Sequence, residues 1–219
     1  EAGADLETIT TAAQSVIRGA ISIGMSLDTC TVPGSPKEDR ISAGKAELGL
    51  GIHGEAGIEQ VDFSGARSAM QMVVEKLLPH TGSGDHVALL NNLGSTTPLE
   101  MSILAEELAR SPLGGKVKWM IGPAPLMTSL DMHGFSVSLL PVDHAQVTSL
   151  AAPVAPHSWP GLSPFGAVAL RPLPDGLSPI QPVPSAHAAR RTLIERCCKA
   201  LIAAEADLNQ LDAKSGDGD

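Results

Sequence analysis

The residue whose surroundings most favour chemistry is His53. It stands in the run Gly49-Leu-Gly-Ile-His-Gly-Glu-Ala-Gly57, which has four glycines in nine residues. Glycine permits positive φ angles and adds no side-chain bulk, so a ligand can approach the backbone closely. A histidine placed there could serve as a nucleophile or a proton donor. Taken alone, such a run at a strand end more often holds a structural histidine, and both interpretations stay open at this point.

Three carboxylates form a second group close to residue 219. Asp212, Asp217 and Asp219 fall within eight residues, around the end of a predicted helix, and the intervening glycines let the chain fold back. Hard cations such as Mg²⁺ prefer oxygen ligands of this kind, usually with phosphate oxygens in the same shell. A cation would also offset the unfavourable interaction of acidic residues with a helix C-terminus. A solvated turn is the alternative, and the spacing is not that of an EF-hand.

Two further polar segments lie where the chain is expected to turn. Asn91 and Asn92 precede Gly94 at the junction of a predicted strand and helix, where α/β folds often bind anions. Asp131 and His133 precede another predicted strand. We interpret the first segment as a capped strand-to-helix turn and the second as a polar turn, rather than as catalytic sites.

Hydrophobic periodicity predicts an α/β arrangement of elements that would position these residues. The clearest unit spans residues 87–121, where a buried strand, a helix and a second strand follow one another. Thr97 and Glu100 have the spacing of a capping box, with Pro98 at the first helical position. Strand, helix and strand in this order predict a parallel pair of strands. The whole pattern predicts helices over 5–21, 65–78 (capped by Ser64) and 98–110, and strands over 25–32, 48–52, 87–93, 116–122 and 135–142.

The composition changes after residue 150. Nine of the 17 prolines lie between residues 151 and 186, and we interpret 163–186 as a linker between domains. A new helix is expected from about residue 185 to residue 211, with an apolar stripe that needs a packing partner. That stripe consists of Leu193, Cys197, Leu201, Ala204, Leu208 and Leu211.

The bulk composition argues against several classes of protein. The chain has 219 residues, 43% of them hydrophobic, and a formal net charge of −9 at pH 7. The acidic balance and the absence of a basic run argue against a nucleic-acid partner. No apolar run approaches the ~20 residues that span a bilayer, so no membrane partner is expected. Three cysteines, two of them adjacent, are not a disulfide framework, and we expect a reducing, cytoplasmic location.

The motifs occur in an order that resembles the dihydroxyacetone kinase family. Residues 30–34, 47–57, 90–94 and 128–136 resemble the second half of that family's substrate domain. Residues 208–219 resemble the opening of its nucleotide-binding domain. The resemblance covers nearly the whole chain except the proline-rich stretch.

The resemblance implies a fold class and a division into three parts. Residues 1–162 resemble the C-terminal half of the substrate-binding domain, which belongs to the α/β class and has a mixed sheet with helices. Residues 163–186 follow as the proline-rich linker. Residues 187–219 then resemble the start, with the first helix, of an all-α domain that binds ATP and Mg²⁺.

The resemblance also implies roles for the two groups of residues. In the family, the histidine of Gly-Ile-His-Gly-Glu bonds covalently to the carbonyl carbon of dihydroxyacetone as a hemiaminal, and it matches His53. The family's loop aspartates hold Mg²⁺ ions that bridge ATP phosphates. They match Asp212, Asp217 and Asp219.

Together these matches imply an ATP-dependent kinase of the single-chain type, acting on dihydroxyacetone, with glyceraldehyde as a second candidate substrate. The full-length protein is expected to be a homodimer. Family substrate domains begin well upstream, with a half that carries further substrate contacts and the base, so these 219 residues alone are not expected to turn over. Two alternatives stay open. One is a non-catalytic carbonyl-binding or regulatory module that keeps His53, and the other is a lyase that splits FAD to cyclic FMN at the same metal site.

Overall fold

The chain consists of two units. The computed structural model describes residues 3–37, 39–51, 56–172, 174–176 and 186–212, except for the side chain of Asp212. The first unit comprises residues 1–31 and 37–167, and the second comprises residues 168–218 with the short segment 32–36. The first unit holds the sheet, and the second holds two helices.

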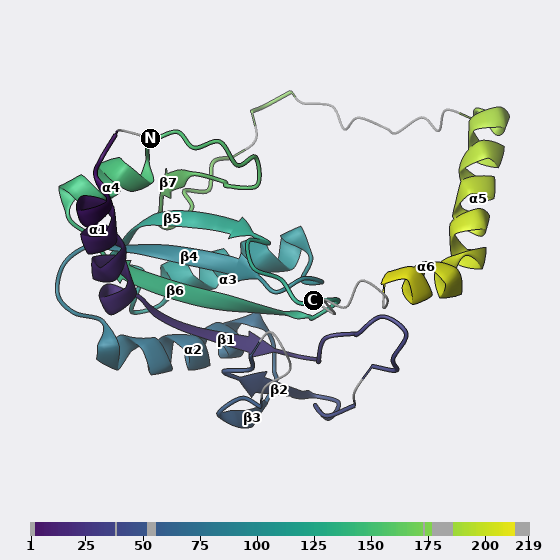
Figure 1. Ribbon diagram of the computed structural model, residues 1–219, viewed down its shortest axis with the longest axis horizontal. Coiled ribbons are helices and arrows are strands. Elements are labelled where there is room, and N and C mark those ends of the chain that lie inside the picture. The colour runs from purple at the N-terminus through teal and green to yellow at the C-terminus, as the bar shows by residue number, and fades with distance from the viewer. Residues whose placement is uncertain (1–2, 38, 52–55, 173, 177–185, 213–219) are drawn as a thin grey trace. The chain divides into compact units, whose positions relative to one another are not determined.

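Seven described strands form one mixed sheet in the first unit (Figure 1). The strands are β1 (Ile21–Ser26), β2 (Lys45–Leu48), β3 (Glu59–Asp62), β4 (His86–Asn92), β5 (Val117–Ala124), β6 (Gly134–Pro141) and β7 (Leu162–Pro164). Their order across the sheet is β3-β2-β1-β6-β4-β5-β7. Only β4 and β5 run parallel, and the other neighbouring pairs are antiparallel. The parallel pair predicted from residues 87–121 is therefore confirmed.

Four α-helices and one short 3₁₀ helix accompany the sheet in the described part of the first unit. They are α1 (Leu6–Gly19), α2 (Ala66–Leu77), η1 (Leu78–His80), α3 (Pro98–Arg110) and α4 (His144–Leu150). α2 and α3 lie side by side against one face of the sheet (Figure 1). α1 precedes β1, and none of its residues is buried in this unit.

The main hydrophobic core lies between the sheet and the pair α2 and α3. Aliphatic and methionine side chains make up nearly all of it, as expected for a chain with 2% aromatic residues. From the helices come Ala69, Met70, Val73, Val74, Leu77, Met101, Leu104 and Leu108, and from the strands come Met25, Ala46, Leu48, Ala88, Leu90, Val117, Met120, Phe135, Val137 and Leu139. Strand residues at alternate positions share this face, because successive side chains of a strand point to opposite sides.

Serine and glycine occupy alternate positions on the other face of the neighbouring strands β1 and β6. Ser22 of β1 lies opposite Ser138 of β6, and their hydroxyl oxygens are 2.7 Å apart. Gly24 lies opposite Ser136 in the same pair of strands. The sheet therefore presents two chemically different faces, one covered by α2 and α3 and the other carrying serine and glycine.

The helix α3 begins as the sequence predicts. The Thr97 side chain accepts a hydrogen bond from the Glu100 backbone, and the Glu100 carboxylate accepts one from the Thr97 N–H at 2.8 Å. These reciprocal bonds satisfy two backbone donors that a helix N-terminus otherwise leaves unpaired. Pro98 occupies the first turn, where its missing N–H costs nothing.

Other elements differ from the predictions in their bounds. The predicted strand 25–32 is wrong: β1 lies earlier, because α1 ends at Gly19 and the alternation begins at Ile21. The predicted strand 48–52 is displaced in the same way, since Gly49 has a φ of 77° and ends β2. Ser64 does not cap α2. Gly65 is the N-cap, and the Ser64 hydroxyl donates to the Ser68 hydroxyl instead.

The sheet continues into residues 163–165, which we interpreted from the sequence as part of the linker. β7 pairs with β5, and the Phe165 N–H donates to the Lys118 carbonyl at 2.8 Å. Phe165 is partly buried against the main core. The first unit therefore extends to residue 167, and the proline-rich remainder begins at Val168.

The second unit contains two consecutive helices in place of the single helix expected over 185–211. α5 (Ala188–Ala203) has Ala204 as its C-cap, and α6 (Glu205–Asp212) follows directly. Glu205 and Asp207 stand in the first turn of α6, where acidic side chains interact favourably with the helix dipole. Apolar side chains of both helices, such as Leu193, are exposed within the described residues.

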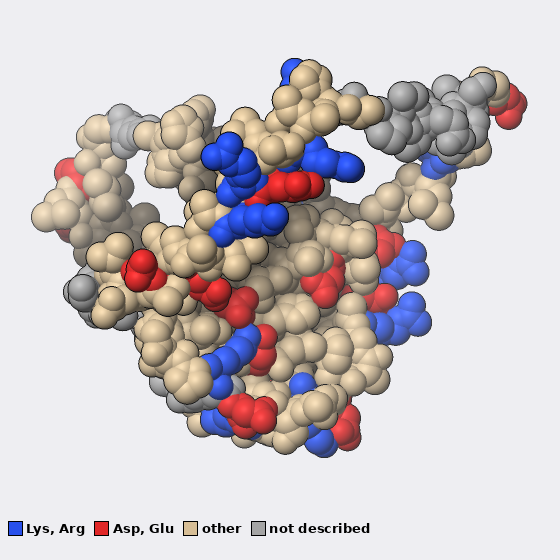
Figure 2. Space-filling view, turned by 90° about the vertical axis from the view of Figure 1, so that its right-hand side faces the viewer, with Lys and Arg blue, Asp and Glu red and all other residues tan. Residues whose placement is uncertain are grey.

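No helix in the described part of the chain is long and apolar enough to cross a bilayer. On the face seen in Figure 2, basic and acidic side chains lie interspersed over the described surface.

We predict that limited proteolysis cuts this protein first between residues 168 and 186. The described residues 168–172 are exposed, and exposed backbone outside regular structure is the preferred substrate of proteases. A protease of broad specificity, with the fragments sized by mass spectrometry, should release a resistant product that ends close to residue 167. First cleavage within residues 87–121 would contradict this boundary, because β4, α3 and β5 all contribute buried residues to the main core.

Candidate functional site

The predicted site residues lie at or beyond the edges of the described residues. His53 is in the gap at 52–55, and Asp217 and Asp219 are in the segment 213–219, so all three lie outside the described residues. Asp212 is the last residue of α6, and its side chain lies outside them as well. The structure describes the elements next to these residues in the sequence. These are β2 and β3 on either side of His53, and α6 before Asp217 and Asp219.

The glycine-rich run around His53 connects β2 to β3. The Gly49 N–H donates to the Gly24 carbonyl of β1 at 2.7 Å, which ties the start of the connection to the sheet. The Ile58 N–H donates to the Leu48 carbonyl, also at 2.7 Å, which joins the two stems to each other. Positive φ at Gly49 turns the chain out of β2. The two ends of the connection are thus held together at the end of the sheet, with His53 halfway between them in the sequence.

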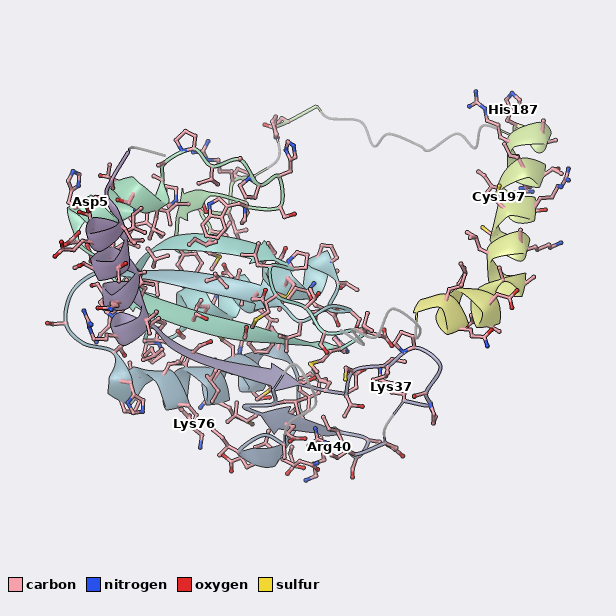
Figure 3. The ribbon with its side chains drawn as sticks, viewed as in Figure 1. Asp5, Lys37, Arg40, Lys76, His187 and Cys197 are labelled. Carbon is pink, nitrogen blue, oxygen red and sulfur yellow. The ribbon has the colours of Figure 1, made fainter. Side chains whose placement is uncertain are left out.

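A buried carboxylate lies at the base of this connection. Glu47 of β2 is only 3% exposed, and it points away from the main core because its neighbours Ala46 and Leu48 point into it. Its two carboxylate oxygens accept hydrogen bonds from Arg40 Nη1 at 2.8 and 2.9 Å. Its Oε1 also accepts a hydrogen bond from the backbone N–H of Gly57. Figure 3 shows Arg40 on the segment that leads into β2.

Only glycine fits at position 57. A β-carbon there would lie 2.5 Å from the Leu48 carbonyl oxygen and 2.8 Å from Cγ of Glu47. Such distances are shorter than van der Waals contact, and the first involves backbone that cannot move without disturbing β2. The close approach of Gly57 to Glu47 is therefore part of how the connection closes.

A second network of charges joins the segment after β1 to the turn before β6. The Lys37 ammonium donates to the carboxylates of Asp28 at 2.8 Å and of Asp131 at 3.2 Å. Burial favours a lower pKa for Lys37, but the hydrogen bonds and charges of the two carboxylates outweigh it and raise that pKa. The hydrogen bond from Lys37 and its positive charge hold the pKa of Asp131 below its usual value. The Thr31 hydroxyl donates to Asp131 as well, at 3.2 Å.

The turn 128–134 is held from both sides. Asp131 has a left-handed φ of 55°, which is uncommon for a residue with a side chain. The His133 N–H donates to Asp28 Oδ1 at 2.6 Å, and His133 Nε2 lies 3.2 Å from Glu100 Oε1. The hydrogen bond from the Thr97 backbone is the main cause of the lowered pKa of Glu100. The contacts of Asp131 and His133 agree with our interpretation of this segment as a polar turn.

The side chains of Asn91 and Asn92 both form hydrogen bonds to the backbone of nearby turns. Asn91 Oδ1 accepts from the N–H groups of Leu126 and Met127 at 2.9 Å, and its Nδ2 donates to the Met127 carbonyl at 2.7 Å. Asn92 accepts from the Gly94 N–H and donates to the Thr96 carbonyl. These bonds agree with the interpretation of this segment as a capped strand-to-helix turn.

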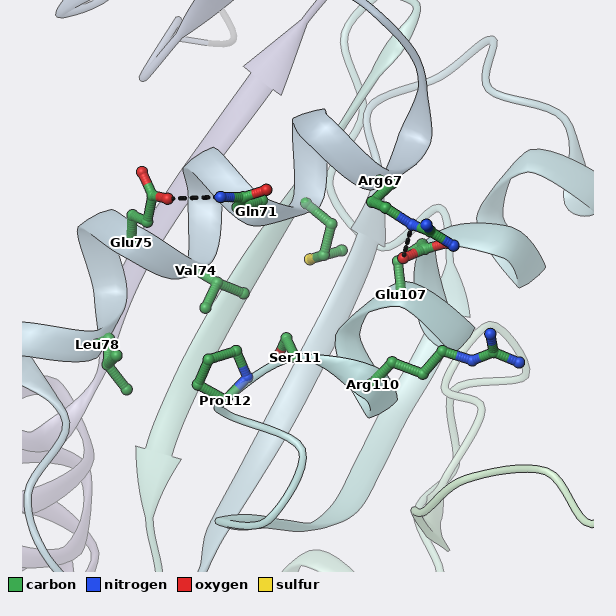
Figure 4. A pocket seen from close by; sticks show the side chains of 10 residues that line it. Arg67, Gln71, Val74, Glu75, Leu78, Glu107, Arg110, Ser111 and Pro112 are labelled. Carbon is green, nitrogen blue, oxygen red and sulfur yellow. Dashed lines mark hydrogen bonds and ion pairs between the residues drawn. The ribbon is translucent and has the colours of Figure 1, made fainter.

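Of the hollows in the described part of the first unit, two lie beside α3, away from the glycine-rich connection. One, of about 350 Å³, is a groove between α2 and α3 (Figure 4). It carries an ion pair of 3.3 Å between Arg67 and Glu107. The other, of about 220 Å³, lies under the start of α3 and is lined by Leu27, Phe63, Thr96, Glu100, His133 and other residues. Neither hollow is lined by Glu47, Gly49 or Gly57.

The described residues contain no group of three His, Cys, Asp or Glu side chains that could hold a metal ion. The candidate donors Asp212, Asp217 and Asp219 lie beyond that search. Their chemistry fits Mg²⁺, because all three are hard oxygen ligands. α6 ends at Asp212, so the other two aspartates follow a helix C-terminus, where a cation is electrostatically favourable.

Sequence reasoning gave no role to Arg40, Glu47 or Lys37. The signal for Glu47 was weak, because this acidic residue stands between Ala46 and Leu48, both apolar, but Lys45 directly precedes them. Arg40 and Lys37 carry no such signal, since they lie in a polar segment and their partners become neighbours only in the folded chain.

Known structures resemble this fold. The dihydroxyacetone kinase of Citrobacter freundii, in a complex with AMP-PNP and Mg²⁺, matches with a TM-score of 0.74 and 35% identity over 99% of this chain and 41% of that chain. The dihydroxyacetone kinase operon co-activator Dha-DhaQ matches with a TM-score of 0.66 and 27% identity over 73% of this chain and 51% of that one. The predicted fold class, a mixed sheet with helices of the dihydroxyacetone kinase type, is therefore confirmed.

Curated relatives agree in sequence. Dihydroxyacetone kinase of Citrobacter freundii is 35% identical over 223 residues, and triokinase/FMN cyclase of Homo sapiens is 32% identical over 238 residues. Both alignments cover 100% of this chain but only 40% and 41% of the relatives, so the chain spans about two fifths of their length. The model of the Dak1 domain matches residues 1–157. The chain belongs to the Dak1 domain family, with dihydroxyacetone kinases and triokinase/FMN cyclases among its relatives.

Proposed function

We propose that this chain is part of an ATP-dependent kinase that phosphorylates dihydroxyacetone, with glyceraldehyde as a second candidate substrate. The observation that carries the proposal is the glycine-rich connection between β2 and β3, whose stems are hydrogen-bonded together on either side of His53 in the sequence. Such a connection offers a histidine with room for a small ligand beside the backbone. Relatives that align over the whole chain are kinases, which supports phosphoryl transfer as the reaction.

The names of the relatives point to a class of substrate. They include a dihydroxyacetone kinase, a putative 3,4-dihydroxy-2-butanone kinase and an L-erythrulose kinase. All three compounds are short ketones with a hydroxyl group on a carbon next to the carbonyl. A site that recognises the carbonyl itself would accept this class and reject polyols such as glycerol, which have only hydroxyl groups.

His53 would recognise the carbonyl by forming a covalent bond to it. One ring nitrogen of the neutral imidazole attacks the carbonyl carbon, and the electrons of the C=O π bond move to the oxygen. That oxygen takes up a proton, and the other ring nitrogen loses one, so the product is a neutral hemiaminal. The reaction needs no oxidant and is reversible, which suits a group that binds a substrate and then releases it.

Asp212, Asp217 and Asp219 would hold Mg²⁺ together with ATP. Mg²⁺ keeps several waters and commonly uses one or two carboxylates plus phosphate oxygens, so three aspartates suffice for two ions that share ligands. When bound, the metal neutralises charge on the phosphates of ATP. The solved kinase with AMP-PNP and Mg²⁺, which aligns over 99% of this chain, supports both cofactors.

Two other functions have support among the relatives. The operon co-activator shares the fold, which favours a regulatory module, but it aligns over only 73% of this chain. A module that only binds a carbonyl has no use for the three aspartates. The triokinase/FMN cyclases support a lyase that splits FAD at the same metal site. ATP consumption by the native protein with dihydroxyacetone, glyceraldehyde or glycerol, together with release of AMP from FAD in the absence of ATP, distinguishes the three functions.

Further properties belong to the same proposal. We expect a homodimer in the full-length protein and a cytoplasmic location. Residues 1–219 alone span 40% of the relative from Citrobacter freundii, so we expect no turnover from this stretch by itself.

We predict that dihydroxyacetone soaked into crystals of the native protein shows continuous electron density to the ring of His53. A His53→Ala variant should lose binding of dihydroxyacetone by calorimetry and keep its binding of ATP, because the two ligands occupy different domains. A ligand bound away from His53, or unchanged affinity in the variant, would contradict the assignment.

We predict that Asp217→Asn lowers kinase turnover by more than about 100-fold, since even indirect changes at metal sites cost about 10–100-fold. Binding of dihydroxyacetone should stay close to that of the wild type. A coupled assay of ATP consumption measures the first effect and calorimetry the second. Asp207→Asn, which changes an aspartate in the first turn of α6, is the matched control. Wild-type turnover in Asp217→Asn would refute the metal assignment.

A further inference from the structure

We propose that Glu47 is a positioning residue for substrate binding, which it serves by clamping the two stems of the connection between β2 and β3. This inference rests on the proposed function of His53, but the evidence comes from described residues on either side of it. Glu47 itself touches no substrate in this scheme. It acts through Gly57, whose N–H it holds.

The burial of Glu47 indicates a specific role. Its side chain is 4% exposed, whereas both partners of the ion pair between Lys45 and Asp62 are exposed, at 41% and 87%. A buried carboxylate is unfavourable unless it is paired and hydrogen-bonded, and an apolar side chain would occupy the same place without that penalty. The buried charge of Glu47 is therefore best explained by the groups that its carboxylate holds in position.

Glu47 links three segments that are separate in the sequence. Arg40 comes from the segment before β2, Glu47 from β2 itself, and Gly57 from the stem that leads into β3. The Gln60 side chain of β3 adds a bond to the Arg40 carbonyl at 3.0 Å. The carboxylate thus connects the two stems to each other and to the preceding segment.

Among the hydrogen bonds of the described residues, the bond to Glu47 is the one that fixes the Gly57 N–H. The backbone bonds at Gly49 and Ile58 hold the start of the connection and the residue after its end. The bond to Glu47 holds Gly57, the last residue of the run. Covalent addition to a carbonyl requires the attacking atom at a definite distance and angle, so a shift of this stem should weaken the adduct.

The test is the steady-state kinetics of Glu47→Gln in the native protein. Glutamine keeps the shape of the side chain but removes the charge that attracts Arg40. It also replaces one of the two accepting oxygens with an NH₂ donor, so that a single amide oxygen is left to serve both Arg40 and Gly57. We expect the KM for dihydroxyacetone to rise about 100-fold, since a misplacement of about 1 Å costs about that factor. The KM for ATP should stay within about twofold, because ATP is bound by a different domain.

Two further variants separate position from charge. Gly57→Ala changes no charge but forces the stem away from Leu48 and Glu47, and it should raise the same KM. Asp62→Asn makes the same chemical change as Glu47→Gln, but in the exposed pair with Lys45 on the neighbouring strand. It should leave both KM values within about twofold of the wild type.

Other outcomes overturn the inference. A wild-type KM for dihydroxyacetone in Glu47→Gln would show that the carboxylate does not position the connection. A lower kcat with both KM values unchanged would indicate only a loss of folded protein, which thermal unfolding of each variant also measures. If Glu47→Gln does not fold, Arg40→Lys is judged by the same KM criterion. If the wild type does not phosphorylate dihydroxyacetone at all, it is the proposed function that fails.

Discussion

The arrangement of the first unit depends on the position of β6. This strand pairs with β1 on one side, through residues 134–139, and with β4 on the other, through residues 135–141. Without it, the segment that contains β1, β2 and β3 would share no edge with the parallel pair β4 and β5. The core under α2 and α3 is continuous because β6 supplies Phe135, Val137 and Leu139 at its centre.

The same pairing brings the polar segments together. β1 ends where β6 begins, because the two strands are antiparallel and Ser26 lies opposite Gly134. The segment after β1, with Asp28 and Lys37, therefore meets the turn before β6, with Asp131, and the three charges pair there. β2 continues the sheet beyond β1, so Glu47, which lies opposite Ser26, stands close to the same edge. Chemistry-bearing residues from distant parts of the sequence thus gather where strands end, as in many α/β proteins.

The two units are suited to different tasks. The first has a continuous core and closes a glycine-rich connection with a buried ion pair. The described residues of the second form two helices with exposed apolar side chains, and a run of aspartates and glycines follows these helices in the sequence. Binding a small ketone in one unit and metal and nucleotide in the other would separate the selection of the substrate from the supply of the phosphoryl group. The relatives that align over both units are kinases, whereas the co-activator aligns over less of the chain.

The sequence by itself determined the features that depend on a few neighbouring residues. The capping box of α3, the apolar run of β4 and the parallel pair that follows from them could all be predicted, because their signals lie within one short segment. The motif around His53 and the aspartates at 212, 217 and 219 likewise pointed to a family and a reaction, although their geometry lies outside the described residues.

Only the tertiary structure decided how the elements are joined and which charges are buried. The position of β6 between β1 and β4 depends on contacts between residues more than one hundred positions apart, such as Ser22 and Ser138. The bounds of β1 and the cap of α2 were predicted wrongly because local propensity does not report what packs against a segment. Glu47 was visible as an acidic residue between two apolar ones, but its role required Arg40 and Gly57 as partners. Burial is a property of the folded chain, and it alone distinguishes a carboxylate that clamps two stems from one that is merely solvated.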